Sequence, residues 1–148
     1  MSEKPIFKRI LVGYDGSENA DRALGRAIAL AAKSRGELRI VVVADTRRYT
    51  ATVGLESLYK QFDEKTRKNA ENLASAALEQ AKSAGIANAF SSVEVGHPSD
   101  MILSVAADDR SDLIVVGRRG IGGLERFLLG SVSTAVISNA KSDVLVVK

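Results

Sequence analysis

Short apolar runs alternate with longer segments of helical periodicity along the chain, and this alternation restricts the fold more than any other feature. Five runs are typical of strands, at residues 9–14, 38–43, 89–95, 113–116 and 144–147. Strands that alternate with helices predict a mostly parallel sheet with helices on both faces. We therefore expect an α/β fold, a Rossmann-like open sheet of five parallel strands in the order 3-2-1-4-5.

Four segments between these runs have helical periodicity. The first carries its apolar residues on one face, at Ala20, Ala23, Leu24, Ala27, Ile28 and Ala31. The second extends from about Glu56 to Gly85, with an apolar stripe of Leu58, Phe62, Ala70, Leu73, Ala77 and Ala81. The third has Pro98 in its first turn, where the missing N–H does no harm. The last runs from Ser131 to about Asn139.

The composition predicts one globular domain over residues 1–148, since 45% of the residues are hydrophobic. No apolar run approaches the roughly 18 residues of a membrane span, and "MSEKPIFKRI" has no signal-peptide core. We therefore expect a cytoplasmic protein without a membrane partner. Cysteine is absent, which excludes disulfides and thiolate metal sites. The net charge is +3 and no basic cluster is interleaved with aromatic residues, which argues against nucleic acid binding.

Two loops have the least ordinary sequences, "GYDGS" after the first strand and "GRRGIGG…GS" after the fourth. In open parallel sheets, ligands bind beyond the carboxyl ends of the strands, where the strand order reverses. In the order 3-2-1-4-5 that reversal lies between strands 1 and 4. The two loops should therefore meet there and form the functional site.

The residue types in these loops suit a phosphorylated ligand. Unpaired amides at the start of a helix attract anions, and the amides in question belong to Ser131, Val132 and Ser133. Three glycines allow close approach of the backbone, namely Gly117, Gly120 and Gly130. Arg118 and Arg119 add positive charge. Asp15 is an acceptor for a ribose hydroxyl or a base amino group.

Each of these residues also has a purely structural interpretation. A glycine-rich turn is a common connection between a strand and a helix, and Ser131 is a suitable N-cap residue. Asp15 equally suits a cap of the first helix, and both arginines suit a solvated surface. Only the combination of these residues at one edge of the sheet favours a binding site.

The same residues resemble a known family. "ILVGYDGSENA" is similar to the opening of universal stress proteins (UspA family). Gly117-x2-Gly120-x9-Gly130-Ser131 matches the G-x2-G-x9-G-[ST] motif of the ATP-binding branch. "GHPSDMILSVAADDRSDLIVVG" and "SDVLVVK" are similar to the stretch before this motif and to the closing strand, so the resemblance covers essentially the whole chain.

This resemblance implies an ATP site with a divalent cation, Mg²⁺ or Mn²⁺, held mainly by the phosphates rather than by protein side chains. It assigns Gly13, Tyr14 and Asp15 to the nucleoside and the backbone of Val43 to adenine. It assigns ribose and phosphates to Gly117, Gly120, Gly130, Ser131, Val132 and Ser133. The chain departs from common family forms at Arg118-Arg119, at Gly13-Tyr14 and in "TRRYTATVG".

Catalytic groups are few, so we expect a regulatory ATP-binding protein with slow or no hydrolysis. No Walker lysine follows the glycines, and His97, the one histidine, is better suited to capping or packing than to base catalysis. A slow ATPase or nucleotide phosphotransferase and a cyclic-nucleotide (cAMP) binding module remain the alternatives.

The last strand points to self-association. It is apolar throughout, at Val144, Leu145, Val146 and Val147, yet it lies at the sheet edge in the expected order. Unpaired apolar edges recruit other strands. We therefore expect a two-fold homodimer through this strand, with coverage by helices alone as the alternative.

Overall fold

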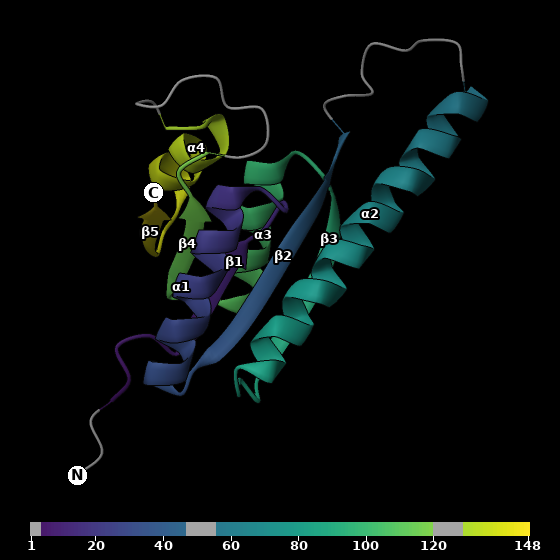
Figure 1. The fold of residues 1–148 in the computed structure, drawn as a ribbon. Helices are drawn as coiled ribbons and strands as arrows, with labels where there is room; N and C mark the ends of the chain where they lie inside the picture. The colour runs from purple at the N-terminus through teal and green to yellow at the C-terminus, as the bar shows by residue number, and fades with distance from the viewer. Residues whose placement is uncertain (1–3, 47–55, 120–128) are drawn as a thin grey trace.

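The structure, a computed structural model, describes residues 4–46, 56–119 and 129–148, with side chains in the second range described from residue 64 onward. Strands and helices alternate along these residues (Figure 1): β1 (Arg9–Gly13), α1 (Glu18–Ser34), β2 (Glu37–Asp45), α2 (Glu56–Ser83), β3 (Ala89–Gly96), α3 (Pro98–Asp109), β4 (Leu113–Gly117), α4 (Ser131–Asn139) and β5 (Asp143–Val147).

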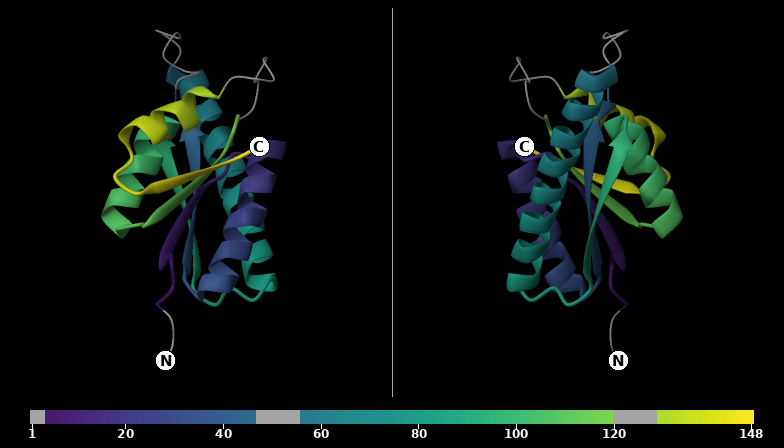
Figure 2. Two further views of the ribbon diagram at one scale, coloured as in Figure 1. Left: turned by 90° about the vertical axis from the view of Figure 1, so that its left-hand side faces the viewer. Right: turned by 90° about the vertical axis from the view of Figure 1, so that its right-hand side faces the viewer.

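The five strands form one sheet in the order β3-β2-β1-β4-β5, and all neighbouring pairs are parallel. The predicted fold and strand order are therefore confirmed. The helices form two layers, with α1 and α2 on one face of the sheet and α3 and α4 on the other (Figure 2). All five strands consequently end at the same edge of the sheet, which we call the carboxyl edge.

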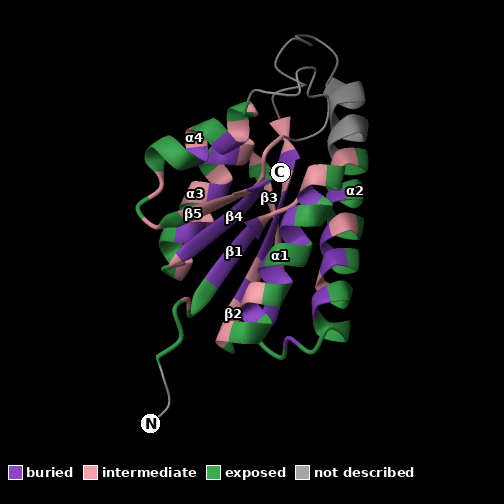
Figure 3. Ribbon diagram, turned by 60° about the vertical axis from the view of Figure 1, so that its left-hand side comes forward, coloured by how far each residue is buried: buried purple, intermediate pink, exposed green. Residues whose placement is uncertain are grey.

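Buried residues lie along the strands and on the sheet-facing sides of the helices (Figure 3), and clusters of hydrophobic side chains pack on both faces of the sheet. The core beneath α1 and α2 includes Ile10 and Val12 of β1, and the core beneath α3 and α4 includes Leu11, because successive strand side chains point to opposite faces. All six residues predicted for the inner face of α1 are buried. On α2, Ala70, Ala77 and Ala81 are buried as predicted, whereas Leu73 is only half-buried. Leu58 and Phe62 lie outside the described side chains.

Two strands end at residues other than the predicted ones, because backbone pairing with the neighbouring strand, rather than apolar composition, determines where a strand ends. The first strand ends at Gly13, one residue before the predicted end. The second strand continues to Asp45, because residues beyond Val41 still pair with β3 after β1 has ended. β2 and β3 therefore extend beyond the end of β1 at the carboxyl edge.

The alternating sequence Val93-Glu94-Val95 does not give β3 one buried face and one face open to water. Val93 and Glu94 are both half-buried, and Val95 is the exposed member, with 38% of its surface accessible. The reason is that β3 is an edge strand with a helix layer on each side, so its two faces are partly covered to different extents.

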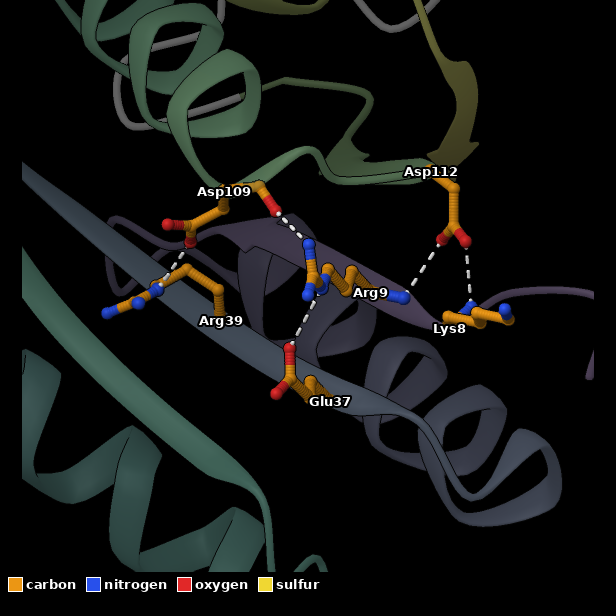
Figure 4. Close-up of polar contacts among 6 residues, drawn as sticks. All are labelled: Lys8, Arg9, Glu37, Arg39, Asp109 and Asp112. Atoms are coloured by element: carbon orange, nitrogen blue, oxygen red, sulfur yellow. Dashed lines mark hydrogen bonds and ion pairs between the residues drawn. The ribbon is translucent and has the colours of Figure 1, made fainter.

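Charged residues cluster at the opposite, amino edge of the sheet (Figure 4). Asp112 accepts hydrogen bonds from the backbone N–H groups of Lys8 and Arg9, at 2.8 and 3.0 Å. The Arg39 Nε atom donates to the Asp109 carboxylate at 2.7 Å. The Asp112 contacts fasten the start of β1 to the residue before β4, and the Arg39 contact fastens β2 to the end of α3. Within the described ranges, no helix combines the length and apolar character needed to cross a membrane.

Candidate functional site

The ends of β1 and β4, from which the two candidate loops start, lie side by side at the carboxyl edge, as the strand order predicts. β1 pairs with β4 from Ile10↔Leu113 to Val12↔Val115, although the two strands are about a hundred residues apart in sequence. The helix after β1 covers one face of the sheet and the helix after β4 covers the other. The ends of the two central strands therefore lie between the starts of these two helices.

The loop between β1 and α1 is a tight turn fixed by its own side chains. Ser17 is the N-cap of α1, and its hydroxyl accepts a hydrogen bond from the Ala20 N–H at 3.1 Å. Asp15 accepts from the Ser17 N–H at 2.9 Å, as in an Asx turn. Asp15 therefore does not itself cap the helix, which was one of its two interpretations. Gly16 has φ +81°, the left-handed region in which glycine carries no steric penalty.

Tyr14 lies in this loop but its side chain points away from the other candidate residues. Its ring packs against the core beneath α1 and α2, and its hydroxyl donates to the Asp21 carboxylate at 2.6 Å. Burial raises the pKa of Tyr14 to about 12, assisted by the hydrogen bond and charge of Asp21 and by the charge of Asp15. Tyr14 offers only backbone to a ligand at the carboxyl edge, where its N–H already donates to Val41 O at 2.9 Å.

The loop after β4 is closed at its base by three hydrogen bonds to the backbone of Arg118. The Arg118 N–H donates to Val147 O, and Arg118 O accepts from the Gly130 N–H, both at 2.8 Å. The buried Ser133 hydroxyl donates to Arg118 O at 2.8 Å and to Gly130 O at 3.2 Å. These bonds hold the start of α4 directly beside the end of β4. They also turn the Ser133 hydroxyl inward, so only the Ser133 amide remains for a ligand.

The first turn of α4 has no side-chain cap. Gly130 is the N-cap residue and supplies no side-chain hydrogen bond, and the first helical bond runs from the Thr134 N–H to Gly130 O. Ser131 is therefore the first helical residue rather than the cap, and it is exposed. The amides of Ser131, Val132 and Ser133 precede the first helical bond, so they are the orphan donors of this helix.

Arg118 and Arg119 lie at the mouth of this loop. The Nε atom of each is buried and has no hydrogen-bond partner within the described part of the chain. Unpaired buried donors of this kind are unusual in folded proteins and call for an acceptor. Gly120, the remaining glycine of the predicted cradle, lies outside the described residues.

Two of the predicted ligand-binding glycines also have a packing role. A Cβ on Gly117 would lie 2.8 Å from the carbonyl carbon of Asn19, in the first turn of α1. A Cβ on Gly13 would lie 2.7 Å from Cδ1 of Ile102 on α3. Glycine at these strand ends therefore allows α1 and α3 to pack closely on the sheet, so close approach of a ligand is not needed to explain either residue.

Two other candidates, Val43 and Val132, lie on the same face of the sheet. Both belong to the core beneath α3 and α4. The same core contains Ile102, whose side chain covers Gly13. The sequence prediction missed Ser17, Asn19 and Ile102, which position the loops. Of these, Ser17 had a readable signal, because a serine directly before a helical pattern is a typical N-cap. The packing partners Asn19 and Ile102 had no signal in the sequence.

Comparison with known proteins identifies the family. The model of the universal stress protein family matches residues 6–148. This chain belongs to the universal stress protein family. A universal stress protein of Staphylococcus epidermidis is 38% identical to the chain over 143 residues, which are 96% of this chain and 84% of the relative.

Solved structures agree with this assignment. The universal stress protein UspA from Lactobacillus plantarum has a TM-score of 0.86 at 24% identity, covering 95% of this chain and 97% of its own, and supports the fold. A universal stress protein in complex with cAMP has a TM-score of 0.72 at 32% identity, covering 96% of this chain and 97% of its own.

Proposed function

We propose that this universal stress protein binds an adenine nucleotide, ATP with Mg²⁺ or Mn²⁺, at the carboxyl edge and acts as a regulatory protein with slow or no hydrolysis. The observation that carries the proposal is the uncapped start of α4, held beside the ends of β1 and β4. Membership of the family and the 32% identical relative in complex with cAMP support nucleotide as the class of ligand.

In this proposal the phosphates bind at α4. The amides of Ser131, Val132 and Ser133 form the anion site that the start of a helix provides. Arg118 and Arg119, whose Nε atoms lack partners among the described residues, supply further donors for phosphate oxygens. A triphosphate uses both sets of donors, which favours ATP over nucleotides with fewer phosphates.

The nucleoside then lies toward β1 and β2. Gly13 and the backbone of Tyr14 form the floor beneath it, and Asp15 is the acceptor for a ribose hydroxyl. The backbone of Val43 extends past the end of β1 and is the edge against which adenine lies. The side chain of Tyr14, directed toward Asp21, has no part in this contact.

The cation enters with the nucleotide in this proposal. Among the residues that the structure describes, no three His, Asp or Glu side chains gather into a metal-binding group. Phosphate oxygens, the preferred ligands of Mg²⁺, therefore hold the ion. The residues above bind and orient the nucleotide, and no contact among the described residues positions any of them to activate water. We therefore propose a nucleotide-dependent change of protein partner instead of rapid turnover.

Proline at position 131 tests the phosphate site. Ser131 is the first residue of α4, where proline is well tolerated, and Gly130 already has the extended backbone that precedes proline. Ser131→Pro removes one amide donor, whereas the control Ser131→Ala removes only the hydroxyl. Calorimetric titration with Mg-ATP should show about a tenfold loss of affinity for the proline variant and a much smaller loss for alanine. Equal affinity of the proline variant and the wild type would contradict the proposed site.

The same titration separates the alternatives. If the protein is a cAMP module, cAMP will bind more tightly than Mg-ATP, because the donors for the outer phosphates then contribute nothing. If it is an enzyme, purified protein will release phosphate from ATP at several turnovers per second. Our proposal expects neither result.

We also propose a homodimer through β5. β5 is an edge strand, and Val144, Leu145 and Val146 are only half-buried. Val147 is buried, with 7% of its surface accessible. The exposed Ile137 of α4 extends the apolar surface of the same part of the molecule. Pairing of two β5 strands satisfies the open backbone groups of both copies.

A further inference from the structure

Ser133 is the buried polar residue of α4, and its main hydrogen bond leaves the helix. The hydroxyl donates to Arg118 O, fifteen residues earlier, at 2.8 Å, whereas its contact to Gly130 O in the preceding turn is longer, at 3.2 Å. A hydroxyl carries a single proton, so the shorter contact is the main bond. Serine within a helix ordinarily bonds a carbonyl of its own preceding turn. A bond from the helix to the loop therefore needs a further reason.

Both carbonyl acceptors of this hydroxyl also have a backbone donor. Arg118 O accepts from the Gly130 N–H at 2.8 Å, and Gly130 O accepts from the Thr134 N–H at 3.0 Å. Loss of the hydroxyl would therefore leave neither carbonyl without a partner, which is the case in which a lost buried hydrogen bond is most destabilising. The effect of the hydroxyl lies instead in where it holds the helix.

The first turn of α4 is anchored to Arg118 O at two points. The Arg118 N–H is itself bonded to Val147 O of β5 at 2.8 Å, so this peptide is fixed to the sheet. The Gly130 N–H alone would leave the helix start free to pivot about one bond, and the Ser133 hydroxyl adds a second anchor three residues later. Hydrophobic burial assists less here, because Val136 is the only buried apolar residue of α4.

The amides proposed to bind phosphate lie between these two anchors. Ser131 and Val132 follow Gly130 and precede Ser133, and their N–H groups come before the first helical hydrogen bond. The directions of these N–H groups therefore depend on how the segment between the anchors is held. Direction matters, because a hydrogen bond weakens steeply as its angle falls.

We infer that Ser133 is a positioning residue of the nucleotide site, whose hydroxyl orients the amides of Ser131 and Val132 by holding the start of α4 on Arg118 O. This inference rests on the proposed function. The buried hydroxyl bonds the protein backbone rather than a ligand, so it acts through the amides of its neighbours. Its loss should weaken the binding of phosphates and leave the nucleoside, proposed to lie toward β1 and β2, unaffected.

Amide hydrogen exchange in the protein without ligand tests the anchor. The variants are Ser133→Ala and the control Ser138→Ala, at an exposed position near the end of α4. In Ser133→Ala, the Gly130 and Thr134 amides should exchange about fivefold to tenfold faster than in wild type, the effect of one net hydrogen bond. The Arg118 amide, which bonds β5, is the internal reference and should not change, and the control should match wild type. Unchanged exchange at both amides of Ser133→Ala would overturn the anchor, whether or not the protein binds nucleotide.

Titration with two ligands tests the consequence for the site, since Mg-ATP carries phosphates and adenosine carries none. Ser133→Ala should bind Mg-ATP about fivefold to tenfold more weakly than wild type, and adenosine within about twofold of it. A purely structural role of the hydroxyl would weaken both ligands alike, and that result would overturn the positioning role. Unchanged affinity for Mg-ATP, in a variant whose Gly130 amide exchanges faster, would also overturn it.

Ser133→Cys serves should the alanine variant not fold. It nearly keeps the size of the side chain but replaces a strong donor with a weak one, so the same losses are expected, and wild-type exchange and affinity would overturn the role of the hydroxyl. Failure of the wild type to bind either ligand would overturn the proposed function and with it the role of Ser133 in binding. The exchange measurement would still decide whether Ser133 anchors α4.

Discussion

At the scale of single residues, the Asp112 carboxylate connects the start of the chain to the sheet through two backbone hydrogen bonds, to the N–H groups of Lys8 and Arg9 (Figure 4). Asp112→Ala leaves both donors to water, because these groups are exposed, and should lower the free energy of unfolding by about 1 kcal/mol. Urea denaturation followed by circular dichroism measures the change. Asp108→Ala, at an exposed position on the last turn of α3, is the control and should be nearly neutral. Equal effects of the two variants would show that the Asp112 contacts contribute nothing.

Tyr14 gives a second residue-scale prediction, from its pKa. The chain contains three tyrosines, and Tyr14, with its pKa raised to about 12 from 10.0 by burial and by Asp21, should ionise last. A pKa raised in the folded state means that this contribution to stability is fully present below about pH 10 and is lost as the pH rises toward 12. Ultraviolet titration should show one tyrosine step near pH 12 that Tyr14→Phe removes. A variant that retains this step would assign it to another tyrosine.

At the scale of elements, the packing of α1 on the end of β4 depends on the absence of a side chain at Gly117. Gly117→Ala places a Cβ 2.8 to 2.9 Å from backbone and Cβ atoms of Asn19, which are rigid parts of a helix turn. Overpacking of this kind costs about 1 to 3 kcal/mol. Gly25→Ala is the matched control, because Gly25 lies within α1 with no atom near its Cβ position, and it should stabilise by about 0.5 to 1 kcal/mol. The urea midpoint should fall for Gly117→Ala and rise for Gly25→Ala. A midpoint of Gly117→Ala equal to that of wild type would contradict the packing role.

The same glycine shows which parts of the fold and site were readable from the sequence. The inner face of α1 was predicted completely, because its periodicity directly records which side of the helix is buried. Gly117 was predicted to be glycine for a ligand, whereas Asn19 is a sufficient reason. A glycine in a sequence shows that something approaches closely but not what approaches. The direction of the Tyr14 side chain follows the strand alternation, since Tyr14 packs against the same core as Ile10 and Val12, whereas its hydrogen bond to Asp21 was not predicted.

The edge strand β3 shows a second limit of prediction from sequence, which concerns the exposure of side chains. The alternation of elements predicted a parallel sheet, and the expected strand order is confirmed, yet the exposure of the residues along β3 was not predicted. Alternation marks a wet face only when one side of a strand is open, and β3 has helices on both sides, so Glu94 is half-buried while Val95 is exposed.

At the scale of the whole molecule, the open edge of β5 predicts how two copies associate. Val147 O accepts from the Arg118 N–H of the loop after β4, so the backbone groups of Val147 and Leu145 face β4, and those of Val144 and Val146 face the open edge. Val146→Pro removes one outward N–H without breaking a bond to β4, and proline is tolerated on edge strands. Sedimentation equilibrium should show a dimer for wild type and a monomer for this variant. A dimer that survives the substitution would place the interface elsewhere.

Nucleotide binding should also stabilise the folded molecule as a whole. The proposed contacts come from the loop at 14–17, from β2 and from the first turn of α4, which are brought together only by folding, so the unfolded chain has no comparable site. At a ligand concentration 100 times the dissociation constant, such linkage raises the free energy of unfolding by about 2.7 kcal/mol. Urea denaturation at a fixed protein concentration should therefore move to a higher midpoint in Mg-ATP.

The Ser131→Pro variant, with about a tenfold weaker site, should gain about 1.4 kcal/mol less free energy of unfolding than wild type at saturating nucleotide. An unchanged urea midpoint of the wild type in Mg-ATP would contradict a site built from these elements. Equal gains in the free energy of unfolding for both proteins would show that the Ser131 amide does not contact the nucleotide.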